Sequence, residues 1–366
     1  MKKTDVYIWC CGMLLFSFVL QSCSREEAMP ENQNHQFPAE QKTKNKQANE
    51  YFSKPEPVTF SLSERFQNEA LVAEPCETTD FGIVLSGYFE SIMNDPVFDF
   101  DLLNYYLELN RKYVTFYMGD NYYGENGEYN QLAAKRIREL EKFWNIDRDI
   151  YLNGQHTSLL NDREILADMI ESFDRTVRNR TEAYQKADLL LELNETSSNF
   201  PENPYFAFDG FTRSSGLLVI GDGLLQSIIE TGIDGDLAFT AILSHEWWHQ
   251  AQFEYAESWD FSDQLAGPAE FSRYSELEAD YAAAYYLTHK RGATFNWKRI
   301  EEYFKLSFNV GDCLTESMDH HGTPTQRLLA AQLGYELADT AHKKGAILEP
   351  SQVHYAFLED YYDIIK

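Results

Sequence analysis

Residues 243–252 read LSHEWWHQAQ and contain the pentapeptide H-E-W-W-H, from His245 to His249. Residues four apart lie on one face of an α-helix, so His245 and His249 can bind the same metal ion. Glu246 projects beside them and can take a proton from a metal-bound water. Because neutral imidazoles suit zinc, the stretch predicts a helix that carries two ligands and the general base of a zinc hydrolase.

The helix around this motif is expected to begin near Asp234, whose side chain can cap its first turn. From Ile242 to Ala251, the only charged or ionisable residues are those of the motif itself. A helix of this composition is typical of a buried element. We therefore expect Trp247 and Trp248 to pack into the core, rather than to face a substrate.

A catalytic zinc site needs a third protein ligand and leaves the fourth position to water. The sequence ELEAD, from Glu276 to Asp280, supplies candidates. On a helix, Glu276 and Asp280 share a face with Ala283 and Leu287, and carboxylates on such an apolar face are costly to bury without a cation or metal. The alternative is that both acids lie at the surface. Glu278 belongs to another face, and we expect it to be solvated.

HEWWH followed by ELEAD resembles the gluzincin metallopeptidases of the CaaX prenyl endopeptidase, HtpX and Oma type. The resemblance implies a zincin-like metallopeptidase domain in which His245, His249 and Glu276 hold one zinc ion. It also implies that Glu246 is the general base towards water and then the general acid towards the leaving amine. Asp280 matches the family residue that orients a zinc histidine.

Upstream segments extend this resemblance. Residues 203–208 (NPYFAF) are similar to the N-x-F-A segment of the family, although Pro204 and Tyr205 blur the match. Residues 216–228 (GLLVIGDGLLQSI) resemble the strand and helix that precede the zinc helix. The strand at residues 217–220 would then be an open sheet edge, to which an extended peptide adds by backbone pairing.

Downstream, residues 321–327 (HGTPTQR) resemble the late H-P-x-x-x-x-R segment of the family, whose His and Arg lie near the metal. Gly322 replaces the usual Pro, and the neighbouring His320 leaves the assignment of the histidine open. We expect His321 or Arg327 to act in catalysis as the donor to the oxyanion. The alternative is a helix-entry turn with a structural salt bridge.

Composition and periodicity bound the fold. The chain has 366 residues and a formal net charge of −28, so it lacks the basic surface that a nucleic-acid binder needs. Helical periodicity is clear in several segments, whereas only residues 216–221 read as a strand. The prediction is an α+β fold, mostly helical, with a small sheet. The helical segments are 132–144, 165–190, 234–251, 277–287, 328–337 and 356–364.

The N-terminus predicts export. Lys2 and Lys3 precede an apolar run from residue 6 to residue 20, and LQSC at residues 20–23 resembles the lipobox of bacterial lipoproteins. We expect residues 1–22 to be a signal peptide and Cys23 to be lipidated. Ser24 resembles the signal for outer-membrane cargo, so we expect an outer-membrane lipoprotein that faces the periplasm or the cell surface. A plain signal peptide that is cut nearby is the alternative.

The remaining chain divides by composition. Residues 23–57 are polar and read as a flexible tether. Residues 58–200 are expected to be a helical region of unassigned role, which forms one compact unit with the metallopeptidase region at 201–366. Cys76 and Cys313 could form a disulfide or remain separate thiols. Residues 122–129 (YYGENGEY) lack the alternating acids of a calcium loop and read as a plain loop.

These features favour a zinc-dependent endopeptidase of the bacterial cell envelope that acts on unfolded or extended polypeptides. Membrane contact is expected only through the N-terminal lipid, because no later apolar run is long enough to span a bilayer. The membrane helices of the prenyl endopeptidase and HtpX branches are missing, so neither CaaX nor integral-membrane substrates are expected. The alternative is a protein-assembly or quality-control binding factor on the same fold, with latent or secondary proteolysis.

Overall fold

The computed structural model describes residues 59–61, 78–259, 264–313, 320–342 and 345–366. The predicted signal peptide, the lipid-bearing Cys23, the tether and Cys76 lie outside the described residues. Cys313 is disulfide-bonded, and it is the sole cysteine within the described ranges. In this part of the chain, no helix combines the length and the apolar character that crossing a bilayer requires.

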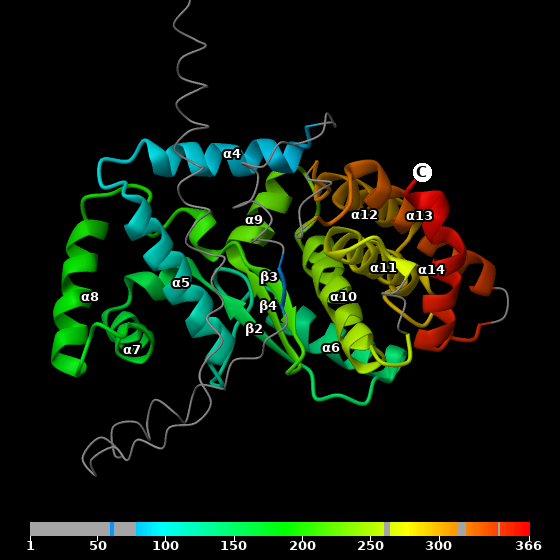
Figure 1. The fold of residues 1–366 in the computed structure, drawn as a ribbon, viewed down its shortest axis with the longest axis horizontal. Coiled ribbons are helices and arrows are strands. Elements are labelled where there is room, and N and C mark those ends of the chain that lie inside the picture. Colours follow the sequence, from blue (N-terminus) through cyan, green and yellow to red (C-terminus); the bar gives the residue numbers. More distant parts are fainter. Residues whose placement is uncertain (1–58, 62–77, 260–263, 314–319, 343–344) are drawn as a thin grey trace, which may run out of the picture.

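The α+β prediction is confirmed, because the described ranges fold into eleven α-helices and a small sheet (Figure 1). Most predicted helical segments are found at their expected places. The elements are β1 (Thr59–Ser61), α4 (Asp80–Met93), α5 (Phe100–Phe116), α6 (Asn130–Trp144), β2 (Tyr151–Gln155), α7 (Arg163–Phe173), α8 (Arg180–Asn194), β3 (Gly210–Arg213), β4 (Leu217–Gly221), α9 (Asp222–Glu230), α10 (Gly235–Glu254), α11 (Pro268–Thr288), α12 (Trp297–Asn309), α13 (Pro324–His342) and α14 (Pro350–Ile364), with 3-10 turns at Thr157–Asn161 and Pro204–Ala207.

The sheet has the strand order β1-β3-β4-β2. Strand β3 pairs antiparallel with both β1 and β4, whereas β2 runs parallel to β4. The turn between β3 and β4 depends on Gly216, whose φ is +96°. A Cβ atom at this position would lie 2.0 Å from the carbonyl oxygen of Asp149, so the turn requires glycine.

The strand predicted at residues 217–220 is present as β4, but the prediction that it forms an open edge is wrong. Strand β4 pairs on both sides, with β3 and with β2, and the edges of this sheet are β1 and β2. A peptide therefore cannot add to β4 by backbone pairing, because its donors and acceptors are already used in the sheet.

The sequence pattern does not predict strand β2, because its middle residues are Asn153 and Gly154, and both residue types are uncommon in strands. The structure explains the asparagine. Its Nδ2 group donates to the carbonyl oxygens of Val114 at 2.7 Å and Tyr117 at 2.9 Å, at the C-terminal end of α5. The buried amide of Asn153 therefore supplies a donor to carbonyl groups at the end of α5, and this polar residue interrupts the apolar pattern of the strand.

The continuous helix expected from residue 165 towards residue 190 is also wrong, because two helices occupy this stretch. Helix α7 ends at Phe173, and Asp174 then accepts hydrogen bonds from the backbone and the hydroxyl of Thr176. Asn179 caps the N-terminus of α8. Asp and Asn side chains that bond nearby backbone groups compete with the helix in this way.

Helix α10 carries the HEWWH motif, and it is buried on all sides over most of its length. It packs against β3 and β4 on one side and against α6, α9, α11 and α12 on the others (Figure 1). The prediction for the two tryptophans is confirmed, because Trp247 and Trp248 are buried. Trp248 contacts Trp144 of α6, with ring centroids 4.8 Å apart, and Trp259, at 5.7 Å.

The described residues contain two main apolar cores. One core joins α5, α7 and α8, at the left of Figure 1. The other joins α6 with α9 through α14 and contains the motif helix. Because α6 and β2 precede residue 200 and pack beside α10 and β4, the half of the molecule that contains the motif helix draws on both sides of the boundary expected at residue 200.

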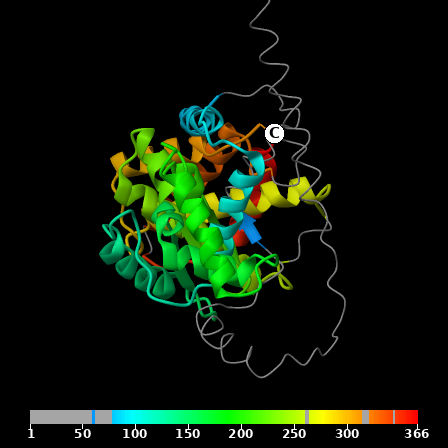
Figure 2. The ribbon, with the colours of Figure 1, turned by 90° about the vertical axis from the view of Figure 1, so that its left-hand side faces the viewer.

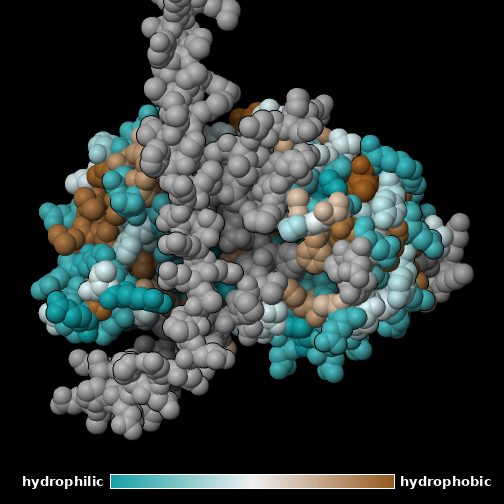
Figure 3. All heavy atoms as spheres, in the orientation of Figure 1, coloured by the Kyte–Doolittle hydropathy of each residue, from teal (hydrophilic) through white to brown (hydrophobic). Residues whose placement is uncertain are grey.

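Three further features of the fold are helix α4, the surface over α8 and the loop at residues 122–129. Helix α4 runs along the top of the molecule and is seen end-on after a quarter turn (Figure 2). Apolar residues gather over α8, where Leu189 and Leu193 are exposed, whereas much of the remaining visible surface is hydrophilic (Figure 3). The loop expected at residues 122–129 is present, and Tyr122 stacks on His156 with ring centroids 3.7 Å apart.

The N-cap predicted for the motif helix gives a stability test. The side chain of Asp234 accepts a hydrogen bond of 3.0 Å from the backbone N–H of Leu237. We expect Asp234→Ala to lower the free energy of unfolding by about 1 kcal/mol, because the backbone N–H of Leu237, in the first turn of α10, then loses its acceptor. Asp236→Ala, in the same turn without a cap bond, is the control and should cost less than half as much. Equal losses in urea unfolding would contradict the capping role.

Candidate metal centre

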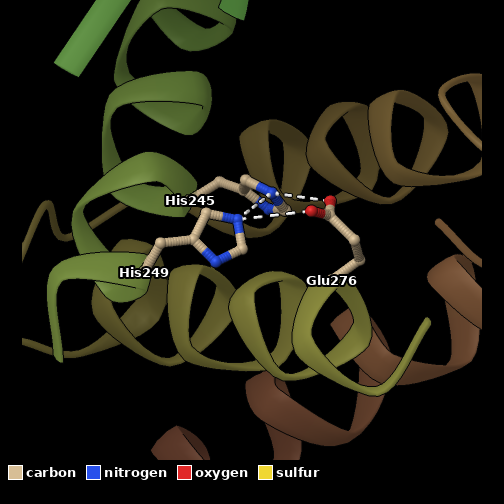
Figure 4. Close-up of side chains that lie close together, drawn as sticks. All are labelled: His245, His249 and Glu276. Atoms are coloured by element: carbon tan, nitrogen blue, oxygen red, sulfur yellow. Dashed lines mark hydrogen bonds and ion pairs between the residues drawn. The ribbon is translucent and has the colours of Figure 1, made fainter. Parts of the chain in front are cut away.

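His245, His249 and Glu276 converge between α10 and α11 (Figure 4). The Nε2 atoms of the two histidines lie 3.2 Å apart. Glu276 Oε2 lies 3.1 Å from His245 Nε2, and Glu276 Oε1 lies 3.4 Å from His249 Nε2. Among the described residues, this is the group of His, Cys, Asp and Glu side chains that could hold a metal ion.

These separations fit a tetrahedral ion. Ligand atoms at about 2.0–2.1 Å from zinc in tetrahedral geometry are about 3.3 Å from one another. The two histidine nitrogens are 3.2 Å apart, and a different carboxylate oxygen of Glu276 lies 3.1 Å from one and 3.4 Å from the other, so these contacts are close to this spacing. Two imidazoles and one carboxylate are also a donor set found in catalytic zinc sites, which keep a fourth position open. The residues that the sequence predicts as ligands therefore fit the ion.

Asp280 lies where the resemblance implies. Its Oδ1 atom is 3.0 Å from His245 Nδ1, one helical turn beyond Glu276. This contact holds the Nδ1 proton and leaves Nε2 free for a metal. Burial alone would lower the pKa of His245, but its hydrogen bonds to Asp280 and Glu276 raise that pKa to about 10 in the metal-free protein.

Arg327 is buried and binds both carboxylate oxygens of Asp280. Its Nε donates to Asp280 Oδ2 at 2.6 Å, and its Nη2 donates to Asp280 Oδ1 at 2.8 Å. The remaining amino group, Nη1, lies 3.4 Å from the carbonyl oxygen of Val310 and 3.8 Å from Glu276 Oε2. These contacts favour a role in holding Asp280 over the predicted donation to an oxyanion.

The structure separates the roles of the two adjacent histidines. His321 Nδ1 lies 3.0 Å from Glu276 Oε2, so His321 contacts the candidate metal group without being one of its three members. The His320 Nδ1 atom instead lies 2.6 Å from Asp312 Oδ1. The other oxygen of Asp312 accepts a hydrogen bond from the backbone N–H of His321. Asp312, which the sequence did not single out, therefore fixes this pair.

Gly322 explains a departure from the family pattern. Its φ is +99°, a conformation that proline, with φ near −65°, cannot adopt. After this turn, Thr323 and Gln326 exchange hydrogen bonds between side chain and backbone, at 3.1 and 3.3 Å, in a capping arrangement that starts α13. Arg327 thereby stands in the first turn of α13, facing Asp280.

Glu246 lies on the metal side of α10 with only 1% of its surface exposed. Its Oε2 atom has no hydrogen-bond partner among the described residues. Burial raises the pKa of Glu246 to about 7, against the opposing charges of His249 and His245. A buried carboxyl group with a free oxygen and a pKa near neutrality can accept and return a proton at neutral pH.

The expectation that Glu278 is solvated is wrong, since only 1% of its surface is exposed. Its Oε1 atom lies 2.6 Å from His354 Nδ1 of α14, and its Oε2 atom accepts from Gln252 Nε2 at 2.7 Å. Helix α11 packs between α10, α13 and α14, so its several faces are buried at once. The sequence pattern of α11 indicates one apolar face, and it does not indicate that the other faces are buried as well.

The chain matches no protein-family model, no curated protein and no solved structure. The interpretation of these residues therefore depends on their geometry and chemistry.

The charge state of His245 predicts how metal binding depends on pH. A ligand imidazole must be neutral, and the pKa of about 10 keeps His245 protonated near pH 7. Binding therefore displaces a proton, and apparent affinity should rise by up to about tenfold per pH unit between about pH 7 and 9. Calorimetry in buffers of different protonation enthalpy would count the proton. An affinity independent of pH in this interval would contradict the assignment.

The third ligand has its own test. We expect Glu276→Ala to lower zinc occupancy to a small fraction of one ion per chain, because two imidazoles alone do not complete a site. Glu270→Ala removes a carboxylate six residues earlier on α11, outside the candidate metal group, and should retain one ion. Elemental analysis after dialysis measures both. Full, tight occupancy in Glu276→Ala would remove Glu276 from the ligand set.

Proposed function

We propose that the protein is a zinc-dependent endopeptidase. The observation that carries this proposal is the buried Glu246, which interacts electrostatically with His245, His249 and Glu276, the three side chains that could together hold a metal ion. This combination supplies a metal site and an adjacent proton acceptor, the two parts that hydrolysis of a peptide bond by water requires.

A bound zinc ion would supply a Lewis acid that polarises the substrate carbonyl and lowers the pKa of a water molecule. The residues of the chain would do the remaining work. Glu246 takes the proton from the attacking water, which its free Oε2 atom and its pKa of about 7 permit. It then returns the proton to the nitrogen of the leaving amine, so that the carboxylate is regenerated.

His321 is the best placed described residue for the oxyanion. It is buried, and its Nδ1 atom lies 3.0 Å from Glu276 Oε2, which places the ring beside the proposed ion. Arg327 is already committed to Asp280. We therefore assign the stabilisation of the oxyanion to His321 and a supporting role to Arg327.

The substrate and location that we propose are an unfolded or extended polypeptide in the bacterial cell envelope. The lipobox-like sequence at residues 20–23 supports the location. The sequence gives no indication of a pocket for a particular substrate side chain. Because β4 lies between β3 and β2, the proposal does not include substrate binding by backbone pairing with β4.

The test is cleavage of casein by the zinc-loaded full chain and by its Glu246→Gln variant. We expect the native protein to release peptides and the variant to lose at least about 100-fold in rate, because an amide cannot act as the base. Zinc content should be the same in both proteins, since Glu246 is not a ligand. Equal cleavage by both would contradict the mechanism. Absence of cleavage in two zinc-loaded proteins would favour the binding-factor alternative.

A further inference from the structure

A second buried network leads away from the metal cluster through His249. We propose that Gln252 and Glu278 are positioning residues, which fix the orientation of His249 and connect this ligand to His354 on the C-terminal helix α14. The inference rests on the proposed metal site and extends it: one ligand histidine is held by Asp280, and the other by a three-residue relay.

Gln252 makes the first link. Its Oε1 atom lies 2.7 Å from His249 Nδ1, one helical turn along α10. Its Nε2 group donates to the carbonyl oxygen of Ser275 at 3.0 Å and to Glu278 Oε2 at 2.7 Å. Two acceptors on the amide nitrogen leave its oxygen to face the histidine. His249 must then donate from Nδ1, so Nε2 is the nitrogen that would bind a metal.

Glu278 makes the second link. Both of its oxygens are used, one by Gln252 and the other by His354 Nδ1 at 2.6 Å. A buried carboxylate with two donors is stabilised, whereas one that loses a donor becomes costly. Glu278 therefore holds the amide of Gln252 in the one orientation that serves His249.

His354 is itself held firmly. Its ring stacks on Trp259, with centroids 4.4 Å apart and planes at 7°, and the hydroxyl of Tyr274 lies 3.3 Å from His354 Nδ1. Trp259 also stacks on Trp248 of the motif helix and donates to Ser351 of α14 at 3.1 Å. The position of α14 and the orientation of a metal ligand are thus parts of one packed assembly.

The two histidines of the proposed metal site differ in the charge of the group that contacts their Nδ1 atoms. His245 contacts a carboxylate directly, whereas His249 contacts a neutral amide that in turn contacts a carboxylate. A direct carboxylate makes the imidazole more basic than an amide does. The relay therefore orients His249 without placing a carboxylate directly against its Nδ1 atom.

The experiment compares Gln252→Met with Gln250→Met in the full chain. Gln250 lies on the same helix, but it bonds Thr212 and the carbonyl oxygen of Arg213, on the side of the sheet. We expect Gln252→Met to weaken zinc affinity by about 10- to 100-fold and Gln250→Met to leave it within about threefold. Chelator competition measures the affinities.

Two further measurements separate positioning from general loss of packing. The absorption spectrum of cobalt(II), which reports the ligand geometry of the ion, should change in Gln252→Met and match the native spectrum in Gln250→Met. Glu278→Met should weaken zinc binding as well, and the double variant with Gln252→Met should be little weaker than either single variant, because both act through one relay. If Glu278→Met does not fold, His354→Phe keeps the stack on Trp259 and replaces it in this cycle.

The outcomes separate this inference from the proposed function. If the native protein binds neither zinc nor cobalt, the proposed function itself is contradicted. If the native protein binds metal while Gln252→Met and Gln250→Met have equal zinc affinities and identical cobalt spectra, the relay does not position His249. Strictly additive losses in the double variant would overturn the link between Gln252 and Glu278.

Discussion

Three buried carboxylates on one helix need hydrogen-bond or charge partners, and this need determines which groups surround α11. Glu276, Glu278 and Asp280 of α11 are each 1–2% exposed, although every buried charge is costly without a partner. Their partners come from different elements: the motif helix α10, the start of α13 and the C-terminal helix α14. The ELEAD segment therefore accounts for why these helices pack around α11.

The same partners set the charge state of the site. Burial alone would raise the pKa of Glu276, but His321 and the hydrogen bonds from His245 and His249 hold it well below its usual value. Asp280 likewise has a lowered pKa, against its burial, because Arg327 lies beside it. Within the described residues, the Oε2 atom of Glu246 has no hydrogen-bond partner, and the raised pKa of this carboxyl group leaves it able to exchange a proton. The proposed ligand and the proposed base thus differ in their neighbours.

The sequence predicts the site better than the sheet. Local spacing suffices for His245, Glu246 and His249, because i and i+4 positions of one helix meet by geometry alone. The apolar helical face makes Glu276 a candidate, and the family resemblance selects it as the third ligand, whereas its convergence with the histidines follows from helix packing. The pairing of β4, the burial of Glu278 and the role of Gln252 depend on which elements lie alongside, and single-sequence periodicity carries no information about that.

Anomalous diffraction at the zinc edge, from crystals of the zinc-loaded full chain, would locate the proposed ion. We expect one peak between α10 and α11, at about 2.0–2.2 Å from Nε2 of His245, Nε2 of His249 and a carboxylate oxygen of Glu276. A crystal with no peak there, or with a zinc ion that lacks two of these three ligands, would contradict the proposed metal site.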